Sequence, residues 1–304
     1  MGIAFGDVEW ALFKLDAIGE SSDAAGERLA AAIQGFDPRL VVVMPDGLAA
    51  NSVRLIRAMQ QILGPDCPIV GGVASESLEF VRTFELYDRE VIDGGVVALA
   101  MRGPIEVVTS ARAGFQPVGA TRTCTRVENG NVILELDGKS ALELYKDFLG
   151  PDIAERPNIG TEYPLAVVGA PGADYMASDA RAQVIRVVRV LDEERGALLC
   201  GGDVDVGSRI RMTRATKDDL IAAARSAVEQ VRAQMPDPAL ALLFNCAGRK
   251  LVLGARYQEE IEAAFSALGD VPRIGFYTYG EIAPVEGANT YHDETFTIAL
   301  VGVR

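Results

Sequence analysis

Short apolar runs alternate with amphipathic stretches along this chain, and the pattern of the first third returns in the last third. The first set is Pro38–Met44, Pro68–Gly72 and Gly94–Met101; the second is Pro238–Phe244, Pro272–Phe276 and Thr295–Gly302. Near-continuous apolar runs of this length are typical of strands covered on both faces. Amphipathic helices are predicted before and between them, among them Thr216–Gln234, which Thr216 and Asp219 cap.

The two sets keep their order at nearly constant offsets of 200, 204 and 201 residues, measured from Pro38 to Pro238, Pro68 to Pro272 and Gly94 to Thr295. Constant spacing of this kind indicates an internal duplication. We therefore predict an α/β protein of two related halves, each a mixed β-sheet covered by helices. Material rich in predicted strands, with a hairpin at Asn129-Gly130, lies between the repeated units. The polar stretch Asp152–Glu162 is the expected boundary, which divides the chain into 1–155 and 156–304.

Charge and cysteine usage narrow the classes of function. The formal net charge is −14, so repulsion from phosphates argues against nucleic acid or an anionic membrane as the main partner. No apolar run is long enough to span a membrane, and no signal peptide is recognisable, so a cytoplasmic protein is expected. The four cysteines are scattered, which favours reduced thiols over a disulfide framework or a zinc site. We expect no metal and no catalytic set, because no recognisable catalytic motif occurs and the chain has one histidine, His292.

Polar and aromatic residues gather at the ends of two strands that we predict to be parallel, Pro238–Phe244 and Pro272–Phe276. If these strands are neighbours, both clusters lie at the carboxyl edge of the sheet, where ligands of open α/β sheets usually bind. A helix with Tyr257, Ile261, Phe265 and Leu268 on one face is predicted between the strands. The candidate ligand-binding residues are Asn245, Cys246, Arg249, Tyr277, Tyr279, Glu281 and His292.

These residue types suit a zwitterion such as an amino acid. Arg249 offers two parallel N–H groups to a carboxylate, and Glu281 offers a charge to an ammonium group. The alternative is an internal Arg249–Glu281 pair that joins two loops. Cys246 is a candidate thiolate near Arg249, or else a buried and inert thiol. His292 is a site residue, a haem ligand or a loop-stabilising histidine.

Several motifs resemble the FIST domain family. Asn245-Cys-Ala-Gly-Arg249 followed by Gly275-Phe-Tyr-Thr-Tyr-Gly-Glu-Ile-Ala-Pro284 resembles the C-terminal half of that domain. Gly114-Phe-Gln-Pro-Val-Gly119 and Leu136-Asp-Gly-Lys-Ser-Ala141 are similar to segments of its N-terminal half, although Ser140 stands where the family often has Pro. The segment Gly71-Gly-Val-Ala-Ser75 is a looser match that lacks a later glycine.

The resemblance implies a sensory domain of intracellular signal transduction that binds a small molecule, with amino acids or related metabolites proposed as ligands for the family. It also implies a separate signalling output protein as partner. Some bacterial relatives are haem-binding nitric-oxide sensors, so haem at His292 is the alternative cofactor, although none is expected. The competing functions are a protein-interaction scaffold and an enzyme that uses Cys246 with His292.

Overall fold

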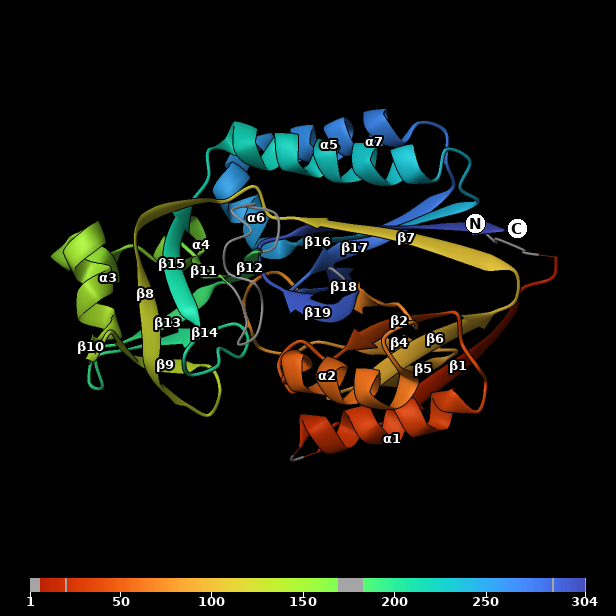
Figure 1. The fold of residues 1–304 in the computed structure, drawn as a ribbon, viewed down its shortest axis with the longest axis horizontal. Coiled ribbons are helices and arrows are strands. Elements are labelled where there is room, and N and C mark those ends of the chain that lie inside the picture. The colour runs from red at the N-terminus through yellow and green to blue at the C-terminus, as the bar shows by residue number, and fades with distance from the viewer. Residues whose placement is uncertain (1–5, 20, 169–182, 286, 304) are drawn as a thin grey trace.

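Two sheets packed face to face, with a pair of helices outside each, form the body of the molecule in a computed structural model (Figure 1). The structure describes residues 6–19, 21–168, 183–285 and 287–303. A third, strongly curled sheet stands to one side of this body, at the left of Figure 1. No helix of the described residues is long and apolar enough to cross a membrane.

The first sheet has six strands in the order β1-β6-β2-β3-β18-β19. Its strands are β1 (Glu9–Leu15), β2 (Leu40–Pro45), β3 (Ile69–Gly72), β6 (Val96–Arg102), β18 (Glu281–Val285) and β19 (Ala288–His292). Its outer face is covered by α1 (Ser22–Gln34) and α2 (Ser52–Leu63). The side chain of Ser21 accepts a hydrogen bond from the backbone N–H of Ala24 and so caps α1.

The second sheet has four strands in the order β17-β16-β20-β7. Its strands are β7 (Ile105–Arg112), β16 (Leu240–Cys246), β17 (Arg273–Thr278) and β20 (Phe296–Val303). It is covered by α5 (Lys217–Gln234) and α7 (Tyr257–Leu268), and the short α6 (Ala247–Leu253) and η2 (Gly254–Arg256) join β16 to α7. Thr216 and Asp219 form the predicted reciprocal cap of α5.

Each central strand is apolar on both faces because it lies between a sheet and a helix layer. In β2, Leu40 and Val42 face the second sheet, whereas Val41 and Val43 face the helices. In β16, Leu242 and Phe244 likewise meet the first sheet, and Leu243 meets α5 and α7. The continuous apolar runs in the sequence are therefore explained by a four-layer helix–sheet–sheet–helix arrangement.

The strand registers confirm the predicted duplication. Leu40 pairs with Met101 across β2 and β6, and Leu240 pairs with Val301 across β16 and β20, a shift of 200 in both members. The β2–β3 and β16–β17 pairs are both parallel. Antiparallel β1 and β7 flank β6 and β20 in the same way. We call residues 9–102 the first unit, and β7 together with residues 217–303 the second unit.

The second unit contributes a hairpin to the first sheet, and the curled sheet interrupts the second unit in sequence. The hairpin β18–β19 of the second unit pairs with β3 of the first, whereas β7 precedes the curled sheet in sequence and pairs with β20 after it. The first unit has its own hairpin, β4 (Glu85–Tyr87) with β5 (Glu90–Ile92), which forms a separate two-stranded sheet. Both sheets of the body are thus built from both ends of the chain.

The curled sheet corresponds to the strand-rich middle of the chain. Its path is β12-β11-β15-β8-β9-β14-β13, with β10 beside β9. Its strands are β8 (Gln116–Glu128), β9 (Val132–Leu136), β10 (Lys139–Ser140), β11 (Leu165–Val168), β12 (Gln183–Arg186), β13 (Val188–Asp192), β14 (Ala197–Cys200) and β15 (Arg209–Arg214). The end strands β12 and β13 are separated in sequence by Val187 alone, so the sheet must curl until its two ends meet. Its concave side packs on α3 (Ala141–Leu149), η1 (Pro151–Glu155) and α4 (Ile159–Glu162).

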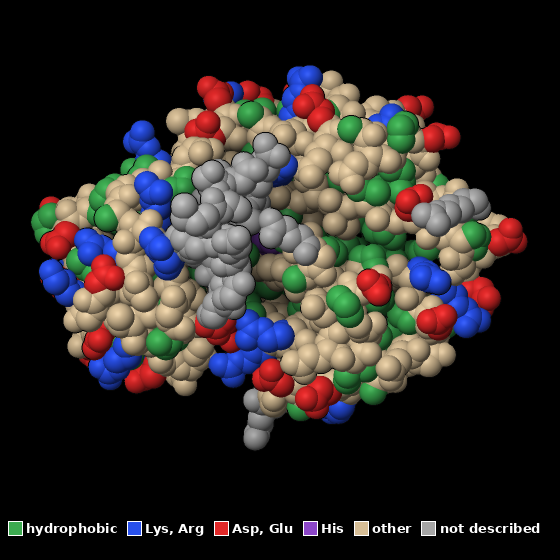
Figure 2. Space-filling model, in the orientation of Figure 1, with side chains coloured by type: hydrophobic (Ala, Val, Ile, Leu, Met, Phe, Trp, Pro, Cys, Tyr) green, Lys and Arg blue, Asp and Glu red, His purple; other side chains and the backbone are tan. Residues whose placement is uncertain are grey.

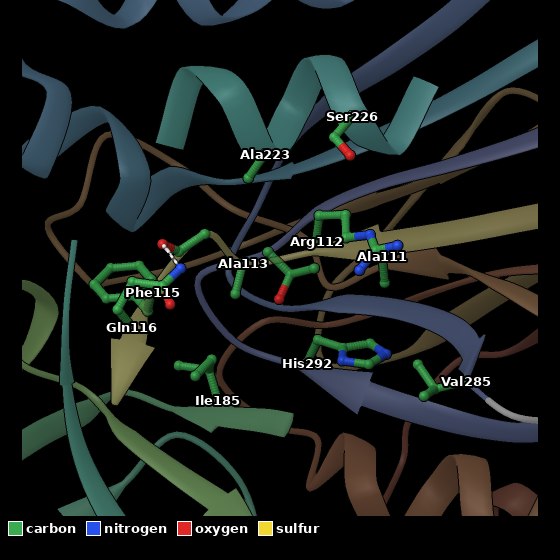
Figure 3. A pocket seen from close by; sticks show the side chains of 12 residues that line it. Ala111, Arg112, Ala113, Phe115, Gln116, Ile185, Ala223, Ser226, Val285 and His292 are labelled. Atoms are coloured by element: carbon green, nitrogen blue, oxygen red, sulfur yellow. Dashed lines mark hydrogen bonds between the residues drawn. The ribbon is translucent and has the colours of Figure 1, made fainter. Parts of the chain in front are cut away.

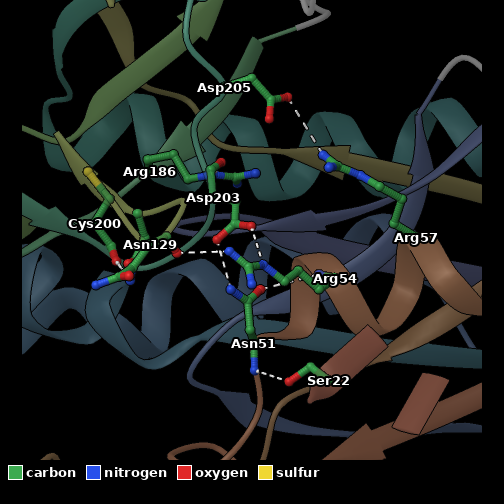
Figure 4. Close-up of polar contacts among 10 residues, drawn as sticks. Ser22, Asn51, Arg54, Arg57, Asn129, Arg186, Cys200, Asp203 and Asp205 are labelled. Carbon is green, nitrogen blue, oxygen red and sulfur yellow. Dashed lines mark hydrogen bonds and ion pairs between the residues drawn. The ribbon is translucent and has the colours of Figure 1, made fainter. Parts of the chain in front are cut away.

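A polar clasp ties the curled sheet to α2 (Figure 4). The Asp203 carboxylate accepts hydrogen bonds from Asn51 Nδ2 at 2.8 Å and from Arg54 Nε at 2.9 Å. Arg186 Nε donates to the backbone oxygen of Asp203 at 3.0 Å. Asp205 reaches Arg57 only at 3.7 Å and is half exposed. Arg54 Nη2 also donates to the backbone oxygen of Asn129 at 2.9 Å, so Asp203 is the main carboxylate of the clasp and not its only connection.

Removing the Asp203 carboxylate should cost about 1–3 kcal/mol of the free energy of unfolding, because two partly buried donors lose their acceptor. Asp205→Ala is the matched control and should cost less than about 0.5 kcal/mol, as expected for an exposed ion pair. Urea denaturation of the parent, Asp203→Ala and Asp205→Ala measures both. Equal losses in the two variants would contradict the assignment.

Candidate functional site

Arg249, on α6, is held by five hydrogen bonds within the protein. Its Nε and Nη2 both donate to Glu260 Oε1, at 2.9 and 2.6 Å. Its Nη1 donates to the backbone oxygens of Ala113 and Glu294, and Nη2 also donates to that of Leu220. All five N–H groups of the guanidinium are thereby used, so none is left for a ligand carboxylate.

Glu260, on α7, is the acidic partner of Arg249, and both side chains are 0% exposed. The second oxygen of Glu260 accepts from Asn245 Nδ2 at 2.7 Å, so Asn245 and Arg249 share one carboxylate. The alternative pairing of Arg249 with Glu281 is wrong, because Glu260 on the inward side of α7 takes that place. This pair joins α6, α7, the end of β7 and the segment before β20.

Glu281, at the start of β18, is a buried carboxyl among neutral donors. Its oxygens accept from Thr278 Oγ1 at 2.5 Å and from the backbone N–H of Thr295 at 3.0 Å. Burial raises the pKa of Glu281 well above its usual range, and these two donors offset only part of that rise. The group therefore favours its uncharged form, which makes it a poor counter-ion for an ammonium group.

Cys246 and Glu294 meet beneath the same corner. Cys246 Sγ lies 3.9 Å from Glu294 Oε1, and both residues are buried. Burial raises the pKa of the Cys246 thiol well above its usual value, with Glu281 and Glu294 adding to the rise. The thiol therefore stays protonated, which agrees with a buried and inert cysteine and removes the thiolate that nucleophilic chemistry needs.

His292 ends β19 and is buried. Its Nε2 lies 3.3 Å from the backbone oxygen of Ala283. Burial lowers the pKa of His292 to about 4, so the ring is neutral at pH 7. A neutral ring that donates from Nε2 to a carbonyl keeps Nδ1 as an acceptor.

Tyr279 lies apart from the Arg249 cluster, whereas Tyr277 is next to it, opposite Asn245 in the parallel pair of β16 and β17. Tyr279 stacks on Phe80 with ring centroids 4.6 Å apart, and its hydroxyl donates to Glu76 Oε1 at 2.6 Å. It thus pins the loop that joins β3 to β4. Tyr277 faces Lys250, whose Nζ lies 4.7 Å from the ring centroid. Neither tyrosine lines the cavity described next.

A cavity of about 210 Å³ opens where the body meets the curled sheet. It lies between α5 on one side and β18–β19 on the other (Figure 3), and Figure 2 shows the surface hollowed between the upper and lower layers. Arg112, at the end of β7, lies between Ser226 of α5 and His292 of β19. The other lining residues are Ala111, Ala113, Gly114, Phe115, Gln116, Ile185, Ala223, Val285 and Thr295.

The corresponding place in the first unit lacks the arginine, the histidine and the threonine, although the buried Glu85 lies beside it. The registers of β1 with β6 and of β7 with β20 make Leu15 the counterpart of Arg112. Ile92 is the counterpart of His292, because each ends the second strand of its hairpin opposite a glutamate. A Cβ added to Gly95, the counterpart of Thr295, would lie 2.4 Å from both the Ile92 side chain and the Leu15 backbone oxygen. Polar side chains and a cavity therefore distinguish the second unit from its duplicate.

Of the seven predicted residues, His292 alone lines the cavity. Four others are buried behind it and pack as two pairs, Asn245 with Arg249 and Cys246 with Glu281. Sequence reasoning missed Arg112 and Glu260. A charged residue on the stripe of Ala264 and Leu268 is a signal that could have revealed Glu260. No comparable signal marks Arg112, because its neighbours Ser226 and His292 are far away in sequence.

The residues around His292 do not suit haem. Its Nε2 faces the Ala283 carbonyl, and the cavity of about 210 Å³ lies below the ~300–1,000 Å³ usual for drug-sized ligands. A porphyrin would need the helix α5 and the β18–β19 hairpin to separate. The cavity is instead of a size for a small metabolite.

Comparison with known proteins identifies the family. Residues 1–139 match the FIST N domain and residues 141–284 match the FIST C domain, so the chain belongs to the FIST family. FIST domains are associated with sensory functions in signal transduction.

Relatives and solved structures add little about the ligand. An uncharacterized protein of Mycobacterium tuberculosis strain H37Rv is 30% identical over 273 residues, which are 86% of this chain and 67% of that protein. An uncharacterized protein of Mycobacterium bovis is 29% identical over the same shares. A crystal structure of cyanuric acid hydrolase from A. caulinodans aligns over 98% of this chain and 99% of that chain, with 10% identity. Its TM-score of 0.23 is too low to support an argument.

Arg249→Met should lower the free energy of unfolding by about 3–5 kcal/mol, because it leaves the buried Glu260 carboxylate without its cation. Arg225→Met is the matched control. It removes an exposed ion pair with Glu229 on α5 and should cost no more than about 0.5 kcal/mol. Chemical denaturation compares the two, and a loss in Arg249→Met as small as in the control would contradict the role given to Arg249.

Glu294→Gln should change the pH dependence of stability. Burial raises the pKa of Glu294 to about 8 from its ordinary value of 4.5. The folded protein holds this proton longer than the unfolded chain, so the stability contribution is complete below pH 4.5 and is lost as pH rises through 8. Glutamine resembles the protonated acid, so the variant should match the parent near pH 4.5 and unfold at a higher denaturant concentration above pH 8. Glu229→Gln, on the exposed face of α5, should show no such gain.

Proposed function

We propose that this FIST protein binds a small metabolite carrying a carboxylate or similar compact anion in the cavity beside His292. The observation that carries the proposal is the difference between the two units. Arg112, His292 and Thr295 line a cavity in the second unit, whereas the first unit has Leu15, Ile92 and a tightly packed Gly95 at these positions. Polar groups at one of two duplicated positions, around a cavity, are best explained by a ligand.

The charge of the lining supports an anionic ligand. Arg112 is the charged residue among the described side chains that line the cavity. Its Nη2 donates to Gln230 Oε1 at 2.7 Å, and a planar guanidinium with five N–H donors can also bind a carboxylate. The neutral His292 adds an acceptor for a ligand hydroxyl or N–H, and Ser226 adds a hydroxyl. An amino acid remains within this class, but its carboxylate would meet Arg112 instead of Arg249. Among the described residues, no carboxylate lines the cavity to receive an ammonium group.

The cavity is also well placed for signalling. Its walls come from α5, from the β18–β19 hairpin and from the start of the curled sheet, so a ligand would contact three parts of the fold at once. A ligand that contacts them better in one arrangement shifts the protein toward that arrangement. A separate output protein would then read the change. Reaction chemistry has less support, because the thiol of Cys246 is buried and protonated.

A thermal-shift screen of amino acids and small mono- and dicarboxylates tests this proposal. A ligand at a hundredfold excess over its dissociation constant should stabilise the folded state by about 2.7 kcal/mol. Ala223→Phe, which fills the cavity from α5, should abolish the shift. Ala222→Phe, on the same helix but outside the lining, is the matched control and should keep it.

Ser226→Phe serves as a second blocking variant, should Ala223→Phe prove unstable beside Gly114. A shift that persists in both blocking variants would place the ligand elsewhere, and no shift with any carboxylate would reject the anion class. An absorption spectrum of the purified protein, recorded first, tests the haem alternative by its Soret band.

A further inference from the structure

Two edge strands on the side away from the cavity leave large apolar side chains in solvent. On β17, Ile274 is 61% exposed and Phe276 is 40% exposed. They pair with Leu242 and Phe244 of β16 and therefore share the face that packs on the first sheet. The apolar layer between the two sheets thus continues onto β17 without a cover there.

The first sheet shows the same feature at its β1 edge. Trp10 is 64% exposed and Leu12 is 42% exposed, although their partners Met101 and Leu99 belong to the layer between the sheets. At the far end of this sheet, β18 packs against β7 and β20, so β17 must lie toward β1. Both exposed groups therefore border one side of the sheet sandwich.

The duplication shows what covers the equivalent place on the other side. There β3, the counterpart of β17, is paired on its outer edge with β18, an antiparallel strand. Ile282 of β18 is fully buried against this junction. Since β4 is the counterpart of β18, the duplication predicts that β4 pairs with β17, as β18 pairs with β3. In the described residues, however, β17 has β16 as its only strand neighbour.

The hairpin β4–β5 is instead held on β1. Lys14 of β1 pairs with Glu90, and the Tyr87 hydroxyl lies 3.5 Å from the backbone oxygen of Leu12. Leu86 and Val91, which face each other across the hairpin, are both exposed. Among the described residues no strand occupies the position beside β17, although the Ser75 hydroxyl donates to the backbone oxygen of Tyr277 at 2.6 Å near the end of the strand. Apolar side chains lie on both flanks of this position.

We propose that the free edge of β17 binds an extended segment of a partner protein as an added antiparallel strand. An unprotected edge strand presents unpaired N–H and C=O groups, which give such a segment its main-chain hydrogen bonds. Apolar side chains at alternate positions of the segment would cover Ile274 and Phe276, as β18 covers the equivalent place on β3. This site lies on the opposite side from the cavity and does not depend on the proposed ligand.

The charge around this edge indicates a basic partner. Residues 76–93, which form the loop and hairpin beside it, contain six acidic and two basic residues. Glu85 is buried, and Glu90 and Asp93 pair with Lys14 and Arg82, so the remaining acidic charge comes from Glu76, Glu79 and Asp88, against Arg89. The whole chain carries a formal charge of −14, so a second copy would be repelled, whereas a segment with Lys or Arg between its apolar residues would be attracted. The partner segment is thus extended, apolar at every second residue and basic in between.

The test uses the full chain and the synthetic peptide acetyl-Lys-Ile-Lys-Val-Lys-Ile-Lys-amide. Titration by fluorescence anisotropy should show saturable binding, and amide hydrogen exchange of residues 273–278 should slow at least tenfold in the complex. Ile274→Lys should weaken binding at least tenfold. Val190→Lys, which changes an exposed apolar strand residue of the curled sheet, is the matched control and should bind as the parent does.

A peptide of equal charge with proline at its central position separates strand addition from charge attraction, because proline cannot complete the ladder. It should bind at least tenfold more weakly. Equal binding of the two peptides, binding that survives Ile274→Lys, or a complex without protection of β17 would overturn the proposal. So would sedimentation showing a dimer of the parent that Ile274→Lys dissociates, since the occupant would then be a second copy.

Discussion

The arrangement of the second unit depends on one buried ion pair, Arg249 with Glu260. A guanidinium without solvent contact is tolerable only if every N–H finds an acceptor, and here the acceptors come from α7, α5, the end of β7 and the segment before β20. These are also the elements that shape the cavity, since Arg112 and Ala113 lie at the end of β7 and Thr295 precedes β20. The pair therefore fixes the cavity walls without contacting the cavity itself.

Around this fixed centre, burial disfavours the charged form of several acidic groups. Burial raises the pKa of Glu281 and Asp293 above their usual ranges, and that of Glu294 to about 8. The first unit keeps one such acid, Glu85, whose pKa burial raises to about 8, but it has glycines at 94 and 95 where the second unit has Glu294 and Thr295. Duplication supplied two copies of one scaffold, and the two copies now differ in what they carry at the same corner. The second copy carries the cavity in which we propose that a ligand binds.

Much of this fold could be predicted from apolar patterning, because a strand between two layers must be apolar on both faces. The paired runs beginning at Pro38 and Pro238 revealed the duplication for that reason. The pairing of β18 with β3 and of β7 with β20 could not be predicted, because local sequence does not specify a partner strand far away in the chain. At the site, the helical stripe of α7 was assigned around Phe265, which is partly exposed, while the buried stripe contains Glu260. Because Glu260 lies on the buried face of α7 and not on the predicted one, sequence reasoning did not identify it as the partner of Arg249.

The pairing of β18 with β3, far apart in sequence, has a consequence for synthesis on the ribosome. The first unit is complete at Arg102, yet the outer edge of β3 waits for β18, which begins at Glu281. Some 180 further residues must be made, which takes ~10–40 s at ~5–20 residues per second. Through that interval the nascent chain has a folded but open sheet, a state prone to aggregation. A chaperone bound at this edge, or translation without pauses, would protect the open sheet from aggregation.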